Sequence, residues 1–163
     1  MIADIVGWYD DGTGPGDLFT GVTPARLLDS RTTVGSFNGK LGAGDAGVKS
    51  LAVKGAVVPA TATAVVINLT ATGGSENSFL QVFPSGASRP NSSNVNFGIG
   101  QTIPNLVTVP IGADGKVSFF NAAGVVDVVA DVVGYFDPTA GGNRFLDILN
   151  DLEQLEAEIQ RGL

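Results

Sequence analysis

Glycine and proline divide this chain of 163 residues into two unequal parts, and that division limits its possible folds more than any other feature. All eight prolines lie before residue 140, and of the 23 glycines only Gly141, Gly142 and Gly162 lie beyond it. They separate short runs rich in valine and threonine at intervals of about 8–12 residues, a spacing typical of antiparallel β-sandwiches and barrels. No long helical pattern lies between these runs, which argues against β-α-β units.

Alternation of apolar and polar residues locates the strands. Residues 64–72 and 106–111 alternate regularly, and Gly112–Lys116 has the Asp-Gly pair of a tight turn that leads into Val117 and Phe119. Further strands are expected at 18–20, 25–28, 48–53, 79–83, 95–97 and 125–136. The side chains expected to face a core are Val65, Ile67, Leu69, Ala71, Val107, Val109 and Ile111.

These patterns predict an all-β fold, an antiparallel β-sandwich of the jelly-roll or Greek-key type, with an appended C-terminal α-helix. The sandwich is expected over residues 1–140 and the amphipathic, coiled-coil helix over residues 141–163.

Composition excludes several classes of function. With 9 basic and 16 acidic residues the net charge is −7, so we expect no binding to nucleic acid or to anionic membranes. The chain has no cysteine and no histidine, which excludes disulfides, thiolate nucleophiles, Cys/His zinc sites and the usual general base at neutral pH. We expect no cofactor and no metal. No secretion signal is evident, and the most apolar stretch, residues 122–136, is too short to span a bilayer.

One phrase occurs twice in the chain. The sequence "ADIVGWYD" at residues 3–10 is repeated as "ADVVGYFD" at residues 130–137, with five of the eight positions identical. The favoured interpretation is that both copies are edge strands of one sandwich, and the alternative is that they pair between neighbouring subunits. The side chains expected to face a core are Ala3, Ile5 and Tyr9 in the first copy, and Ala130, Val132 and Phe136 in the second.

The densest charge cluster of the β-region is formed by Arg26, Asp29 and Arg31 in "ARLLDSR". Two further carboxylates, Asp127 and Asp131, lie among valines on one face of the strand at residues 125–136. The arginines could clamp a ligand carboxylate or an acidic sugar. We favour internal pairing of the arginines with Asp131 or Asp127, because such carboxylates need partners when they are partly buried.

Six motifs in order resemble a known family. They are "TPARLLDSR" (23–31), "VVPATATAVVINLTAT" (57–72), "FLQVFPSG" (79–86), "RPNSSNVNF" (89–97), "VTVPIGADGKVSFFN" (107–121) and "ADVVGYF" (130–136). Together they resemble a repeat module of actinobacterial secreted and cell-surface proteins, which opens with Pro-x-Arg-Leu-Leu-Asp-(Thr/Ser)-Arg and closes with Asp-Val-x-Gly-Tyr-Phe. The resemblance covers residues 18–136 and implies a β-rich, non-catalytic module that occurs in tandem, each module preceded by the closing strand of the one before.

The C-terminal residues have the spacing of a coiled coil. Apolar residues fall at steps of three and four, with Leu149 widening the stripe, Asn143 as N-cap and Gly162 at the end. A lone helix of this length is marginal in water, so the stripe must be buried. Self-association into two or three strands is favoured over packing on the chain's own β-domain or docking into another protein. The stripe consists of Phe145, Ile148, Leu149, Leu152, Leu155 and Ile159.

Three weaker sites have simpler explanations. Residues 10–17 combine aspartates and glycines, but their spacing does not match a calcium-binding EF-hand loop, and a flexible loop is favoured. Asp127 and Asp131 are four residues apart on one strand, about 13 Å at about 3.3 Å per residue, which is too far for a glycosidase pair. Trp8, Tyr9, Tyr135 and Phe136 could stack on sugars, but are more typical of a core or interface.

These observations favour binding over catalysis, and we expect that the protein is not an enzyme. The favoured hypothesis is a structural protein of an assembly: a bacteriophage virion component, as capsid decoration, head-fibre or tail protein, located in the virion. It would form a homo-oligomer, with a trimer favoured, and would contact capsid or tail proteins. The alternative is a cell-surface or cell-wall carbohydrate-binding module excised from a secreted actinobacterial repeat protein.

Overall fold

The computed structural model describes residues 5, 7–8, 16–138, 152–156 and 158–162. In the stretch 16–138 the chain forms strands joined by turns, with one short 3-10 helix, η1, at Asp45–Gly47. The strands are β1 (Leu18–Asp29), β2 (Lys49–Ala52), β3 (Ala64–Thr72), β4 (Ser78–Pro84), β5 (Val95–Phe97), β6 (Thr102–Pro110), β7 (Lys116–Asn121) and β8 (Asp127–Asp137).

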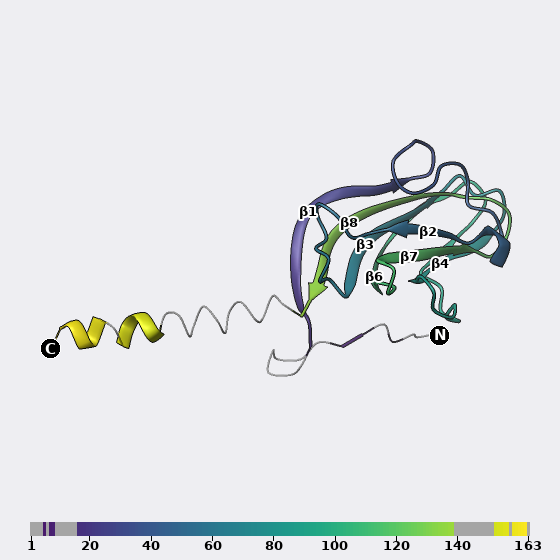
Figure 1. The fold of residues 1–163 in the computed structure, drawn as a ribbon. Helices are drawn as coiled ribbons and strands as arrows, with labels where there is room; N and C mark the ends of the chain where they lie inside the picture. The colour runs from purple at the N-terminus through teal and green to yellow at the C-terminus, as the bar shows by residue number, and fades with distance from the viewer. Residues whose placement is uncertain (1–4, 6, 9–15, 139–151, 157, 163) are drawn as a thin grey trace.

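The strands form two four-stranded sheets with the orders β1-β8-β3-β6 and β2-β7-β4-β5 (Figure 1). The pairs β1–β8, β2–β7, β3–β6 and β4–β5 are all antiparallel, so the chain runs out and back as one long hairpin with β4–β5 at its tip. Rolling such a hairpin into two facing sheets produces a jelly roll. The predicted all-β antiparallel sandwich with a C-terminal helical segment is confirmed.

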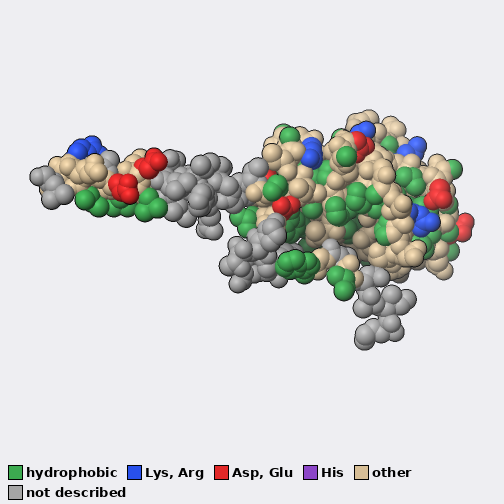
Figure 2. Space-filling model, turned by 60° about the horizontal axis from the view of Figure 1, so that its bottom comes forward, with side chains coloured by type: hydrophobic (Ala, Val, Ile, Leu, Met, Phe, Trp, Pro, Cys, Tyr) green, Lys and Arg blue, Asp and Glu red, His purple; other side chains and the backbone are tan. Residues whose placement is uncertain are grey.

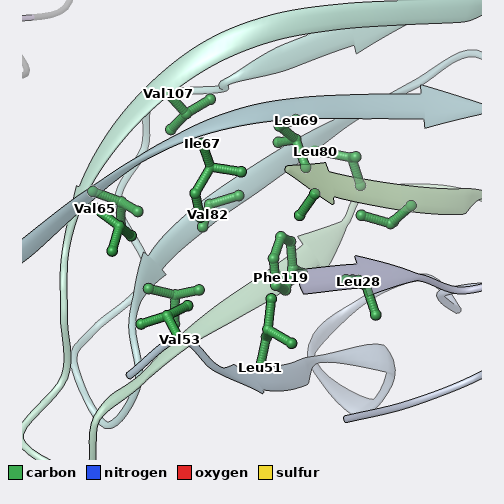
Figure 3. Close-up of a cluster of buried hydrophobic side chains, with 14 of the residues drawn as sticks. Leu28, Leu51, Val53, Val65, Ile67, Leu69, Leu80, Val82, Val107 and Phe119 are labelled. Atoms are coloured by element: carbon green, nitrogen blue, oxygen red, sulfur yellow. The ribbon is translucent and has the colours of Figure 1, made fainter. Parts of the chain in front are cut away.

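The core lies between the two sheets, and β3 supplies its centre. Val65, Ile67, Leu69 and Ala71 are all buried, as their alternation predicts, because every second side chain of a strand points to the same face. Side chains from both sheets meet in a single cluster (Figure 3). Among its members are Leu28, Leu51, Val53, Leu80, Val82, Val107, Val109 and Phe119, and Ile111 packs against it.

The expected strands are found with small differences in their bounds. The segments expected at 18–20 and 25–28 belong to one continuous strand, β1, because its pairing with β8 runs from Leu18 to Asp29 across two irregularities. The Asp-Gly turn is present, with Gly115 at φ +76°. It connects β6 in one sheet to β7 in the other, so it lets the chain cross the sandwich.

β8 is an internal strand, with β1 on one side and β3 on the other. The expectation that both copies of the repeated phrase are edge strands is therefore wrong for the second copy. The first copy also differs from expectation. Ile5 is 94% exposed and so does not face a core, while Ala3 and Tyr9 lie outside the described residues.

A β-bulge in β8 changes which aromatic side chain enters the core. Val66 and Ile67 are neighbours on β3, but they pair with Gly134 and Val132 of β8. Val133, which lies between those two, is therefore an extra residue without a partner in the register. The alternation shifts at this point, and Tyr135 packs against the core. The expectation that Phe136 faces the core is therefore wrong, because its ring lies against the half-exposed Phe19, with 5.4 Å between centroids.

Residues 152–156 and 158–161 are helical. Leu152, Leu155 and Ile159 are each more than half exposed, and Phe145, Ile148 and Leu149 lie outside the described residues. The short described helix leaves the coiled coil a prediction. In the part of the chain that the structure describes, no helix is both long and apolar enough to cross a membrane.

Two leucines on neighbouring strands test where the core lies. Leu69 on β3 is buried, whereas Leu106 on β6 is 62% exposed. Leu69→Ala should lower the free energy of unfolding by about 2–5 kcal/mol, because it leaves a cavity in the core. Leu106→Ala should change it by less than about 0.5 kcal/mol. Urea unfolding measures both, and equal losses in the two variants would contradict the core described above.

Candidate functional site

The charge cluster of Arg26, Asp29 and Arg31, at the end of β1, forms a network of ion pairs that joins β1 to β8. Arg26 and Asp131 are partners in the β1–β8 register, so their side chains lie beside each other. Arg26 Nε donates to Asp131 Oδ1 at 2.9 Å and Nη2 donates to Oδ2 at 3.2 Å. Its third nitrogen, Nη1, donates to Asp29 Oδ2 at 3.2 Å. Arg26 thus bridges two carboxylates, and the pair with Asp131 is bidentate.

Asp29 is the centre of a second bidentate pair. Arg31 Nε donates to Asp29 Oδ1 at 2.8 Å and Arg31 Nη2 donates to Oδ2 at 2.7 Å. Hydrogen bonding from the Arg31 side chain is the main reason that the pKa of Asp29 falls to about 2, although burial acts in the opposite direction. The pKa of Arg31 is raised by the same hydrogen bonds. The buried Asp29 is therefore held in its charged form.

The backbone of Asp29 also closes the turn that follows β1. Its N–H donates to the carbonyl of Val34, and its carbonyl accepts from the N–H and the hydroxyl of Thr32. Side chain and backbone of one residue thus fix both the arginines and the turn. This explains in physical terms why an aspartate is placed directly at the strand end.

Asp127 has a partner that the sequence pattern did not reveal. Lys40 Nζ lies 2.6 Å from Asp127 Oδ2 and also donates to the carbonyl of Gly73 at 2.9 Å. Ser30 Oγ donates to Asp127 Oδ1 and accepts from the N–H of Val128. The internal pairing suggested by sequence is therefore present for Asp131 with Arg26, while Asp127 pairs with Lys40 instead of an arginine.

This network is suited to holding strands together. The Arg26 and Arg31 forks each face a carboxylate of the same chain, so a ligand carboxylate would have to displace Asp131 or Asp29. Asp131 and Asp127 each lie against a cation of the same chain, so both carboxylates already have partners within the fold. The arrangement supports the structural interpretation of the cluster over the ligand clamp.

The other sequence candidates do not come together as a site. Residues 10–15 lie outside the described part, and Asp17 accepts a hydrogen bond from Thr63. The described residues contain no group of three or more acidic side chains that could hold a metal ion. Of the four aromatics proposed as a platform, Trp8 is 77% exposed, Tyr9 is not described, and Tyr135 and Phe136 face different sides of β8.

A shallow hollow of about 540 Å³ beside β4 and β5 was not expected from the sequence. Asn77 and Gln101 lie on its rim, and their side-chain oxygens accept hydrogen bonds from the N–H groups of Ile99 and Gly98. Their amide nitrogens remain as donors. The residues that line it are Asn77, Ser78, Phe79, Asn96, Phe97, Gly98 and Gln101. Amides that lie far apart in the sequence gave no signal before the strands were placed.

Comparison of the chain with protein-family models, with curated proteins and with solved structures gave no match. The likeness of the six motifs to the actinobacterial surface module therefore stays a resemblance.

The depressed pKa of Asp29 predicts a specific loss of stability in acid. Because its folded pKa is about 2, against a usual value of 3.8, its charged form stabilises the fold fully above about pH 4. This contribution should be lost as the pH falls from about 4 to about 2. Asp29→Asn should be less stable than the wild type at pH 7 and should lack this part of the pH dependence, measured by urea unfolding.

Asp45→Asn is the matched control, because the Asp45 side chain is 85% exposed. That variant should still show the loss of stability between pH 4 and pH 2 that depends on Asp29. An Asp29→Asn variant that keeps the wild-type loss between pH 4 and pH 2 would contradict the role given to Arg31.

Proposed function

We propose that this protein is a non-enzymatic structural component of a larger assembly. In this proposal the jelly roll is the displayed body, and the C-terminal helix joins it to its neighbours. The observation that carries the proposal is an apolar stripe on the helix that no other part of the described chain covers.

The stripe consists of Leu152, Leu155 and Ile159, which are 52%, 55% and 62% exposed. Their spacing of three and four residues places them on one side of the helix. Figure 2 shows hydrophobic side chains gathered along one side of this segment and charged side chains elsewhere on it. A helix this short gains little stability on its own in water, so burial of the stripe against another subunit would stabilise it.

The β-body supports binding over chemistry. The sequence contains no histidine or cysteine, and the carboxylates of the charge cluster are engaged by Arg26, Arg31 and Lys40. A catalytic carboxylate needs access to substrate and a pKa suited to proton transfer. Asp29 has neither, because it is buried and its pKa is about 2.

The finer proposal is a homotrimer that serves as a phage virion component, as capsid decoration, head-fibre or tail protein, with capsid or tail proteins as partners. The jelly roll recurs in viral capsid proteins, and this support is by analogy of fold. The heptad spacing, which allows two or three strands, supports self-association.

Charge placed on the stripe should separate the subunits. Leu152→Asp combined with Leu155→Asp and Ile159→Asp should lower the mass measured by sedimentation equilibrium about threefold, from a trimer to a monomer, because carboxylates cannot be buried at an apolar interface without a large cost. The urea midpoint of the β-body should not change.

Glu153→Ala with Gln160→Ala is the control, because these two residues lie outside the stripe in the heptad. This pair should keep the oligomeric mass. A monomeric wild-type chain, or an oligomer that withstands the three aspartates, would count against the helix as the joining element.

The hollow beside β4 and β5 favours one second candidate, a cell-surface or cell-wall module that binds carbohydrate. An aromatic side chain with amide donors on the rim matches what sugars offer, an apolar face and hydroxyl acceptors. Phe79→Ala should then weaken binding to isolated actinobacterial cell wall about tenfold, a loss of about 1.4 kcal/mol. Leu106→Ala should leave binding unchanged. Absence of any wall binding by the unaltered chain would dismiss this candidate.

A further inference from the structure

The position of β8 between β1 and β3 restricts which side chains the strand can carry. Ala130 and Val132 point into the core and are fully buried. A side chain at Gly134 would have its Cβ 2.3 Å from Phe19 Cε2 and 2.9 Å from the carbonyl oxygen of Thr20, closer than any real contact. We call this place, bounded by β1 and β3 and covered by Phe19, the closing slot.

Two acidic residues of β8 are also fixed in the closing slot. Asp131 receives the bidentate pair from Arg26. Asp137 is buried, and its Oδ2 accepts a hydrogen bond from Thr61 Oγ1 at 2.6 Å. A strand that fills the slot therefore needs a small residue, an aspartate, a glycine and a second aspartate at defined positions.

Residues 3–10 meet every one of these requirements. Aligned with 130–137, they repeat the alanine, both aspartates and the glycine without change. The three differences keep the apolar or aromatic character of the side chain: Ile5 for Val132, Trp8 for Tyr135 and Tyr9 for Phe136. The five conserved positions thus include the four that the geometry restricts.

The described residues of the first copy, Ile5, Gly7 and Trp8, do not lie in such a slot. Ile5 is 94% exposed and Trp8 is 77% exposed, although the equivalent Val132 and Tyr135 are buried and half-buried. Apart from its chain neighbours, no described residue has an atom within 4 Å of the position of a Cβ on Gly7, whereas the space above Gly134 is filled by the ring of Phe19. The closing slot of the described jelly roll is already taken by β8.

The chain therefore carries two copies of a sequence that fits one slot. We propose that residues 3–10 are a donor strand that completes the closing slot of a second β-module of this same type, one that does not close itself with its own β8. In that complex Asp4 would pair with the partner's equivalent of Arg26, and Gly7 would lie under the equivalent of Phe19. Main-chain hydrogen bonds to two strands would supply affinity, as in other cases of strand addition. This interaction is independent of the C-terminal helix.

The first experiment tests the fit in the full chain. Val132→Asp with Gly134→Val disables β8, and Ile5→Asp with Gly7→Val makes the same two changes in the donor strand. The β8 pair should lower the urea midpoint but retain cooperative unfolding, because residues 3–10 take over the slot. The donor pair alone should change nothing, and all four substitutions together should abolish cooperative unfolding.

Trp8 is the chain's only tryptophan and reports the exchange directly. Its emission should be that of an exposed indole in the wild type and should shift to shorter wavelength in the β8-disabled variant. If the donor pair has no effect in either background, or if the β8-disabled variant fails to fold, residues 3–10 do not fit the slot and the proposal is overturned.

The second experiment tests donation between separate molecules. A peptide of residues 1–12 is added to the chain that carries all four substitutions and Trp8→Phe, so that the peptide holds the only tryptophan. Saturable binding with a blue-shifted emission is expected, and the same peptide with Gly7→Val should not bind. If both peptides bind equally well, or if neither binds, the donor-strand proposal is overturned. Either result leaves the sedimentation test of the C-terminal helix unaffected.

Discussion

The structure depends on the insertion of β8 between β1 and β3. This strand hydrogen-bonds to a neighbour on each side and contributes Val128, Ala130 and Val132 to the core, so it links the first strand of the jelly roll to the middle of the chain. Strands far apart in sequence meet here. Among the described strands β1 is an edge strand that pairs with β8 alone, so little else in the sheet would hold it in place. The charge network reinforces this contact, because Arg26 on β1 lies opposite Asp131 on β8.

The same constraint explains why the charged residues serve structure. Aspartates on a largely buried strand need partners, and Arg26, Lys40 and Ser30 supply them from β1 and the loop that follows it. Among the buried side-chain nitrogen and oxygen atoms of the described residues, none is left without a hydrogen-bond partner. The charged residues of the cluster thus hold the strands together. Among the large hydrophobic side chains that the structure leaves exposed are those of the helix stripe and, near the other end of the chain, Ile5 and Trp8.

The regular parts of the fold could be predicted from the sequence, and the irregular parts could not. Alternation located β3 and its buried face because burial of every second side chain is a local property of a strand. The bulge at Val133 could not be predicted, since the apolar residues on both sides of it give no sign in the sequence that the facing of the side chains changes, and only the pairing with β3 shows the extra residue. Arg26 and Asp131 could be proposed as partners from their chemistry, but Lys40 could not be placed against Asp127, because it lies in an irregular segment whose path is set by tertiary contacts. The hollow beside β4 and β5 was missed for the same reason.

Residue-resolved amide hydrogen exchange tests most directly whether β8 is the closing strand on which the fold depends. The amides of Val128, Ala130 and Val132 should exchange only through global unfolding, so their free energies of opening should equal the stability from urea unfolding. The amides of Gly7 and Trp8 should exchange as freely as in an unfolded peptide when the protein is a dilute monomer. Rapid exchange along β8 while β3 stays protected would show that the jelly roll closes without this strand, and would contradict the account.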